Sequence, residues 1–177
     1  MTQRQFPRFD ENTAPAAARD ALATSKRAFG GIPEPLTRYA SSPLTLSTAL
    51  AGLETFEKTS LAPLEREVLA MTMGRVNGCR LCLNLHGRLL KAQQAPAELI
   101  RDLETGRPLA EPRLEALRKF ILSVLERTGD VASPEWTNFR EAGYTHEQAL
   151  EVVTGISVYT LTTFANRLTE TSEDSAP

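Results

Sequence analysis

The sequence lacks the features that mark a secreted, membrane-spanning or nucleic-acid-binding protein. Its first twenty residues contain no apolar segment of signal-peptide type, and no run approaches the ~18 apolar residues of a membrane span. Lys and Arg are dispersed among acidic residues, and the formal net charge is only -2. Without a basic stripe, nucleic acid and anionic membranes are poor partners. We therefore expect a soluble, cytoplasmic protein with no nucleic-acid or membrane partner.

Signals for β-structure are also missing, because no segment alternates apolar and polar residues and no fixed-period repeat or low-complexity tract occurs. Glycine and proline fall mostly between segments that have helical periodicity. The fold class that we predict is all-α. Helices are expected at about 14–29, 43–58, 63–77, 79–93, 96–104, 111–127, 134–142 and 146–168.

The length of 177 residues and the hydrophobic content of 41% suit one ordinary hydrophobic core. We predict a single domain over residues 14–169. Residues 1–13 are polar and aperiodic, which indicates a flexible arm, and residues 170–177 have the composition of a frayed acidic tail.

The last predicted helix has both a start signal and a predicted buried face. Thr145 and Gln148 have the spacing of a capping box, in which each side chain bonds the other residue's backbone N–H. The absence of turn residues over more than 20 positions favours helix, although the segment is rich in β-branched residues. The broad buried face that we expect comprises Leu150, Val153, Ile156, Val158, Leu161 and Phe164.

Cysteine and histidine are scarce, and this makes their grouping informative. The chain has two of each, and the segment GCRLCLNLHG, 78–87, contains Cys79, Cys82 and His86. In a reducing cytoplasm, two cysteines three positions apart are more often catalytic or metal-binding than a structural link. The segment therefore holds the candidate site.

Helical spacing brings these three side chains together. With Asn77 as N-cap, Cys79 and Cys82 are separated by three positions and Cys82 and His86 by four, so all three share one helix face. A helix N-terminus and a nearby histidine both favour a thiolate. On a regular helix the two cysteine Cβ atoms would be about 5–6 Å apart, whereas a disulfide requires about 3.8 Å. Closing the bond would distort the first turn and leave it easily reduced.

One acid on the preceding helix is a candidate partner for the histidine. Glu67 precedes Cys79 by twelve positions, and a helical hairpin could bring its carboxylate beside His86. Glu65 has a more ordinary explanation, because it is the third helical residue after Pro63, where an acid compensates the helix N-terminus.

Two other interpretations of the cysteines stay open at this point. Cys79, Cys82, His86 and Glu67 could in principle supply four zinc ligands, although structural zinc pairs normally come from loops, with two further Cys or His elsewhere. The thiols could also be inert core residues. A thioredoxin fold needs a βαβ context that is absent. The other histidine, His146, is explained as a first-turn residue of its helix. Trp136, Tyr144 and Tyr159 are explained as packing residues.

The four residues, in the pattern Glu-x11-Cys-x2-Cys-x3-His, resemble the motif of a known family. Glu67, Cys79, Cys82 and His86 at these spacings in an all-α chain are similar to the alkylhydroperoxidase D-like branch of the carboxymuconolactone decarboxylase family, which includes uncharacterised peroxidase-related proteins. The likeness covers roughly residues 53–103.

The resemblance implies a thiol-dependent hydroperoxide reductase that needs no cofactor or metal. In the family the second cysteine, here Cys82, attacks a small hydroperoxide, and the first, here Cys79, resolves the sulfenic acid. Glu67 and His86 correspond to the family's proton relay. The family also implies a homo-oligomer, commonly a trimer or hexamer, and re-reduction by a dithiol partner such as a lipoyl domain or a thioredoxin-like protein.

One position departs from the family pattern, and two other functions compete with the first. The residue directly before the second cysteine is often His or an aromatic in the family, and here it is Leu81. A protein without that side chain would lack any help it gives in proton transfer or substrate alignment. The alternatives are a lactone decarboxylase like the family's namesake, whose chemistry needs no cysteine pair, and a non-catalytic, redox-sensing oligomer.

Overall fold

The computed structural model describes residues 6–170, and within this range it is all-α, as predicted. Each of the eight expected helices is present, with ends that differ from the expected ones by at most two residues. The helices are α1 (Ala16–Phe29), α2 (Glu34–Tyr39), α3 (Pro43–Glu57), α4 (Pro63–Val76), α5 (Arg80–Ala92), α6 (Ala97–Thr105), α7 (Pro112–Glu126), α8 (Ser133–Glu141) and α9 (His146–Leu168).

The short helix α2 was not expected from the sequence, because it begins inside the glycine- and proline-rich segment 29–35. Pro33 is its N-cap residue, and Pro35 lies in its first turn. In a first turn the missing N–H of proline costs no helical hydrogen bond. A segment that looks like a helix breaker is therefore also the start of a helix.

The chain divides into two compact units. One unit comprises, of the described residues, 6–55 and 164–170. Its buried apolar side chains include Leu22, Leu36 and Leu46, and the buried Tyr39 hydroxyl donates to the amide oxygen of Asn166 at 2.6 Å. The segment before α1 is hydrogen-bonded to α2, because the Phe9 N–H donates to the carbonyl of Thr37.

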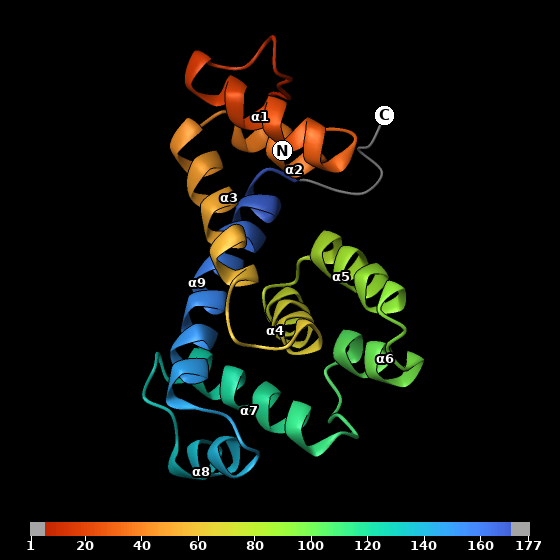
Figure 1. The fold of residues 1–177 in the computed structure, drawn as a ribbon, viewed down its shortest axis with the longest axis vertical. Coiled ribbons are helices and arrows are strands. Elements are labelled where there is room, and N and C mark those ends of the chain that lie inside the picture. Colours follow the sequence, from red (N-terminus) through yellow and green to blue (C-terminus); the bar gives the residue numbers. More distant parts are fainter. Residues whose placement is uncertain (1–5, 171–177) are drawn as a thin grey trace, which may run out of the picture. The chain divides into compact units, whose positions relative to one another are not determined.

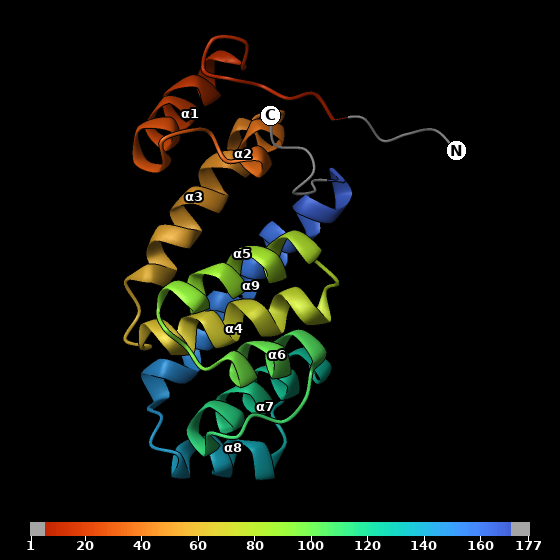
Figure 2. The same ribbon diagram turned by 90° about the vertical axis from the view of Figure 1, so that its right-hand side faces the viewer.

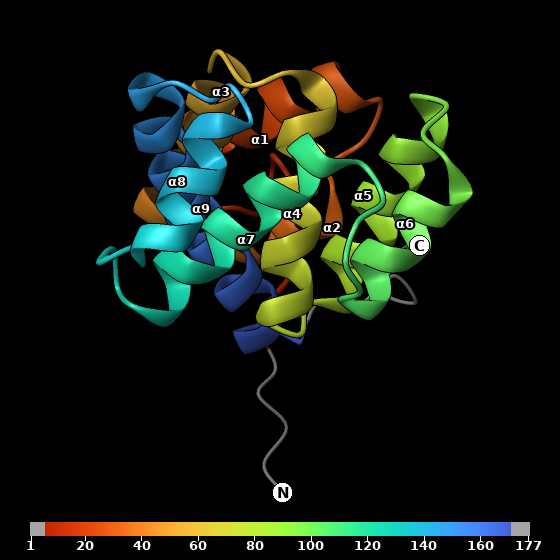
Figure 3. The ribbon, with the colours of Figure 1, turned by 90° about the horizontal axis from the view of Figure 1, so that it is seen from below.

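The other unit, residues 56–163, is built around α4. Helix α4 packs against α5, α6 and α7, and α8 packs on α7, an arrangement that can be followed in Figures 1 and 2 and, from below, in Figure 3. Because neighbours surround it, most of α4 is buried, from Val68 to Gly74 without interruption. Polar side chains on such a helix must find partners inside the protein. Glu67 is one of them.

Helix α9 buries a different face from the one that we predicted. Val158 is buried as expected, but Leu150 is 72% exposed, and Val153 and Phe164 are also exposed. Besides Val158, the buried positions are mostly small or polar: Gln148, Ala149, Val152, Gly155, Tyr159, Thr162, Thr163 and Asn166. A Cβ at Gly155 would lie only 2.5 Å from the ring of Phe56. The buried face of α9 is therefore the one on which its backbone can approach the Phe56 ring closely, and not the one with the largest apolar side chains.

Two further expectations concern the chain as a whole. The limits of the predicted domain, arm and tail stay predictions, and residues 1–5 and 171–177 lie outside the described residues. No helix in the described part of the chain is both long enough and apolar enough to span a membrane.

Candidate active site

The turn between α4 and α5 places the first cysteine. Asn77 is the C-cap of α4, and Gly78 follows it with a φ of 65°, a conformation that glycine adopts without steric cost. The N–H of Cys79 donates to the carbonyl of Gly74 at 2.8 Å, and the N–H of Gly78 to that of Arg75 at 3.3 Å. These two bonds form a Schellman motif, which ends α4 and turns the chain toward α5.

This turn corrects the predicted start of the second helix. Cys79 is not its first residue but its N-cap, with φ −89° and ψ 94°, and its sulfur accepts the N–H of Cys82 at 3.3 Å. Asn77, which we expected as N-cap, instead closes α4 and donates from its side chain to the Thr163 hydroxyl at 2.9 Å. The regular-helix argument for a distorted first turn does not apply, because Cys79 lies outside the helix.

Cys79 and Cys82 form a disulfide, and their Cα atoms are 5.3 Å apart. Both residues are buried, at 2% and 5% exposure. The non-helical backbone of the N-cap lets the first sulfur reach the second across the start of α5. In the reduced protein the Cys79 sulfur would lie at a helix N-terminus beside a backbone N–H, which is a setting that favours a thiolate.

Glu67 and His86 meet in the core of this unit, as the hairpin predicted. Nδ1 of His86 lies 2.8 Å from a carboxylate oxygen of Glu67, and both side chains are buried. An ionised carboxylate can only accept a hydrogen bond, so the neutral imidazole carries its proton on Nδ1 and Nε2 is its basic nitrogen. His86 is one helical turn after Cys82 on the buried face of α5. An acid and an imidazole therefore meet one helical turn after the second cysteine of the disulfide.

The aromatic neighbour of this pair is Tyr159, which the sequence indicated only as a packing residue. Its ring meets the His86 ring edge to face, with centroids 5.3 Å apart. Burial raises the pKa of Tyr159 far above its usual value, and the negative charges of Glu67 and Glu57 add to this effect. No motif links this residue to the cysteines, because it comes from α9, 73 positions after His86. Sequence spacing could not have found it.

Glu65, the other acid of α4, has the structural role at the helix N-terminus that the sequence predicted. Its carboxylate accepts the backbone N–H of Ala62 at 2.8 Å, and thus caps the N-terminus of α4. The same carboxylate pairs with the Arg113 guanidinium at 2.9 Å, and this guanidinium also lies over the Tyr144 ring. Glu65 therefore ties α4 to α7 and is not directed at the cysteines.

Other residues that the sequence singled out do not join the site. His146 begins α9, as expected, and its ring contacts Trp136. Leu81 is half-buried and cannot carry a proton. Within residues 6–170, no group of three or more His, Cys, Asp and Glu residues has the arrangement of a metal site.

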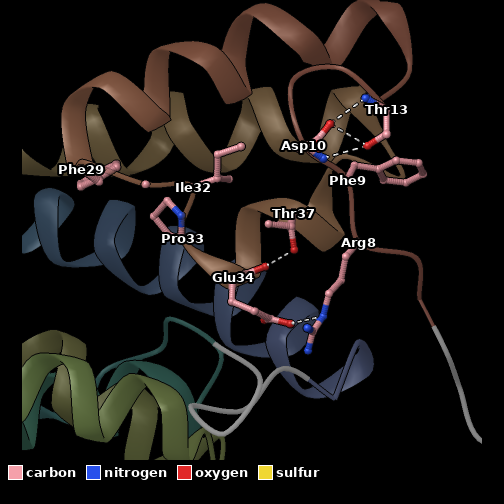
Figure 4. A pocket seen from close by; sticks show the side chains of 10 residues that line it. Arg8, Phe9, Asp10, Thr13, Phe29, Ile32, Pro33, Glu34 and Thr37 are labelled. Atoms are coloured by element: carbon pink, nitrogen blue, oxygen red, sulfur yellow. Dashed lines mark hydrogen bonds and ion pairs between the residues drawn. The ribbon is translucent and has the colours of Figure 1, made fainter. Parts of the chain in front are cut away.

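The first unit contains a separate hollow of about 660 Å³ near its N-terminal segment. Figure 4 shows Arg8 reaching toward Glu34, with 3.4 Å between guanidinium and carboxylate. The Thr37 hydroxyl donates to the Glu34 carbonyl beside it. The hollow is lined by Arg8, Phe9, Asp10, Thr13, Phe29, Gly31, Ile32, Pro33, Glu34 and Thr37. None of the four predicted site residues belongs to it.

Comparison with known proteins identifies the fold. No family model matches the sequence, and no curated protein matches it. Among solved structures, an alkylhydroperoxidase AhpD core, an uncharacterized peroxidase-related protein from Ralstonia eutropha JMP134, matches with a TM-score of 0.79 and 19% identity, covering 92% of this chain and 88% of that chain.

Two further structures have the same fold. An uncharacterized peroxidase-related protein from Silicibacter sp. TM1040 has a TM-score of 0.75 and 19% identity, and the match covers 96% of this chain and 93% of that one. A protein of unknown function from Agrobacterium tumefaciens has a TM-score of 0.60 and 14% identity, with coverages of 72% and 87%. The chain therefore has an alkylhydroperoxidase D-like fold, as the motif implied, and it carries the Cys-x2-Cys disulfide within that fold.

Proposed function

We propose that the protein is a thiol-dependent hydroperoxide reductase. The observation that carries the proposal is the disulfide at the start of α5 together with His86 one turn later, hydrogen-bonded to Glu67. The fold shared with peroxidase-related proteins supports the same conclusion. A redox-active pair, a base and an acid that orients the base are the groups that such a reaction needs.

In the reduced enzyme, His86 takes the proton of the Cys82 thiol on Nε2 while Glu67 holds Nδ1–H. The Cys82 thiolate attacks one peroxide oxygen and breaks the O–O bond. The sulfur becomes a sulfenic acid, and the departing alkoxide receives the proton from His86 and leaves as an alcohol. Leu81 contributes no proton, so this relay depends on Glu67 and His86.

Cys79 then resolves the intermediate. Its thiolate, held at the N-cap of α5, attacks the sulfenic sulfur of Cys82 and releases hydroxide, which leaves as water after protonation. The product is the disulfide of the structure. A dithiol donor, such as a lipoyl domain or a thioredoxin-like protein, reduces it by exchange, so one peroxide and one dithiol yield one alcohol, one water and one donor disulfide. A homo-oligomer, trimeric or hexameric, is part of the proposal, and light scattering would measure it.

Peroxide consumption in the presence of a dithiol tests the proposal. Cys82→Ser should abolish turnover, and His86→Ala should lower kcat/KM by about 10²–10⁴-fold, the usual contribution of a general base. The matched control is His146→Ala, which changes the other histidine, outside the site. A Cys82→Ser variant as active as the parent would contradict the assignment.

The same assay separates the two alternative functions. Rapid disulfide formation with peroxide, without sustained consumption under any dithiol donor, would indicate a redox sensor. Activity on a carboxymuconolactone that survives replacement of both Cys79 and Cys82 would indicate a lactone decarboxylase. Either result would replace the proposed function.

A further inference from the structure

Tyr159 is packed directly against the imidazole of His86. Tyr159 is only 5% exposed, and its ring plane makes an angle of 73° with that of His86. A second edge contact, with Phe56 at 5.7 Å between centroids, holds the tyrosine ring. The Tyr159 ring is thus held in place beside His86, because both ring contacts are in a closely packed interior.

The backbone of α9 explains how the tyrosine reaches this position. Gly155, one helical turn before Tyr159, has no side chain, and a Cβ there would lie 2.5 Å from Phe56 and 2.8 Å from Leu69 of α4. Any larger residue would force the Phe56 ring, the Leu69 side chain or α9 itself to move. The close approach therefore brings Tyr159 to the level of Glu67 and His86.

The two contacts of His86 restrict different motions. The hydrogen bond to Glu67 holds the imidazole at Nδ1. The ring of Tyr159 packs edge to face against the imidazole and so limits swings of the ring plane. Together the two contacts hold the imidazole on the helix face that it shares with Cys82.

The charged groups around the pair indicate what kind of help Tyr159 can give. Glu67 of α4 lies on one side, and on the α6 side Glu104 approaches Gly87, next to His86. Burial raises the pKa of the Tyr159 hydroxyl, the charges of Glu67 and Glu57 raise it further, and Arg66 offsets part of this effect. The hydroxyl therefore stays protonated over the working pH range. A phenol of raised pKa is a poor acid, and the ring contact with His86 offers the route by which Tyr159 can act on the reaction.

We propose that Tyr159 is a positioning residue, which holds the His86 imidazole in the orientation that lets it activate the Cys82 thiol. This inference rests on the proposed function, because it assigns Tyr159 to the relay of the same site. Removal of the tyrosine ring should therefore weaken the effect of His86 on Cys82. Removal of the hydroxyl alone should not.

The experiment measures the rate of alkylation of Cys82 by iodoacetamide as a function of pH. A Cys79→Ser background leaves Cys82 as the one thiol of the chain. In this background, Tyr159→Leu should slow alkylation at neutral pH by about tenfold, which corresponds to one unit in the thiol pKa. Tyr159→Phe keeps the ring and should titrate like the parent.

Two controls separate positioning from loss of packing. Phe139→Leu removes a buried ring of the same unit that is stacked on Phe120 and Tyr144, so it should lower stability and leave the alkylation midpoint unchanged. In a His86→Ala background, Tyr159→Leu should have no further effect on the alkylation rate. If Tyr159→Leu does not fold, Tyr159→Met, which keeps an apolar side chain of adaptable shape, serves in its place.

An unchanged midpoint in the folded ring-deletion variant, or a shift that persists without His86, would overturn the inference. Alkylation requires no peroxide, so its outcome is independent of turnover. A protein that alkylates as expected but consumes no peroxide would refute the proposed function and leave the positioning of His86 by Tyr159 intact. A protein that consumes peroxide, but in which Tyr159→Leu leaves the alkylation of Cys82 unchanged, would refute the positioning role of Tyr159 and leave the proposed function intact.

Discussion

Nδ1 of His86 lies 2.8 Å from Oε2 of Glu67, and each of these side chains is only 11% exposed. The contact joins α4 to α5 across 19 positions of sequence, one helical turn after Cys82. A buried ionisable pair of this kind has structural and chemical consequences together, because the removal of one member leaves the other without a partner in a setting of low dielectric.

The first prediction concerns this pair. His86→Leu leaves the Glu67 carboxylate buried and unpaired, and we expect the free energy of unfolding to fall by about 3–5 kcal/mol. The double variant, Glu67→Leu with His86→Leu, should cost less than the sum of the single changes. Urea unfolding of the four proteins gives the coupling. The exposed pair Arg101 and Glu98 is the control, and its coupling should be at most about 1 kcal/mol. Additive losses for Glu67 and His86 would contradict a coupled pair.

The second prediction tests the role of Cys79 as N-cap. Neither Cys79→Ser nor Cys79→Ala can form the disulfide, but serine is a good N-cap and alanine is not. We expect the serine variant to be more stable by about 1 kcal/mol in denaturant unfolding. Cys82 is buried inside the helix, where a serine hydroxyl cannot cap the N-terminus. Cys82→Ser should therefore be no more stable than Cys82→Ala. Equal stability of the two Cys79 variants would exclude the cap.

The third prediction concerns the close approach of α9. Gly155→Ala places a Cβ 2.5 Å from Phe56, so the ring or the helix must move. Overpacking of this kind costs about 1–3 kcal/mol, and thermal unfolding would show it as a lower Tm. Gly31→Ala is the matched control, because nothing lies within 4 Å of its added Cβ. Its Tm should be unchanged or slightly raised. Similar Tm values for both variants would mean that α9 can retreat at little cost.

The fourth prediction is the alkaline dependence of stability. Burial raises the pKa of Tyr159 above its unfolded value of 10.0, so the folded state binds the phenolic proton more tightly than the unfolded state. This contribution is complete below pH 10 and declines as pH rises further, by at most about 1.4 kcal/mol per pH unit for one group. Tyr159→Phe should lose stability less steeply than the parent between pH 10 and 11. Parallel curves from urea unfolding would argue against a buried, neutral Tyr159.

Much of the site follows from local spacing. Cys82 and His86 lie one turn apart on any helix, and a hairpin of α4 and α5 brings Glu67 to His86 with little freedom. Helical periodicity predicts the start of α5 one residue too early. The reason is the Schellman motif at Gly78, in which the backbone N–H of Cys79 closes α4. Cys79 thus belongs to both helix ends, and helical periodicity alone cannot show that.

The sequence by itself determined the all-α class, the eight longer helices and the grouping of Glu67, Cys79, Cys82 and His86, because these depend on interactions over a few turns of chain. Only the tertiary structure decided which face of α9 is buried and that Tyr159 stands against His86. Helix α9 has apolar residues on several faces, so periodicity offers more than one choice. The contact of Gly155 with Phe56 makes that choice, and it arises only when distant segments pack together.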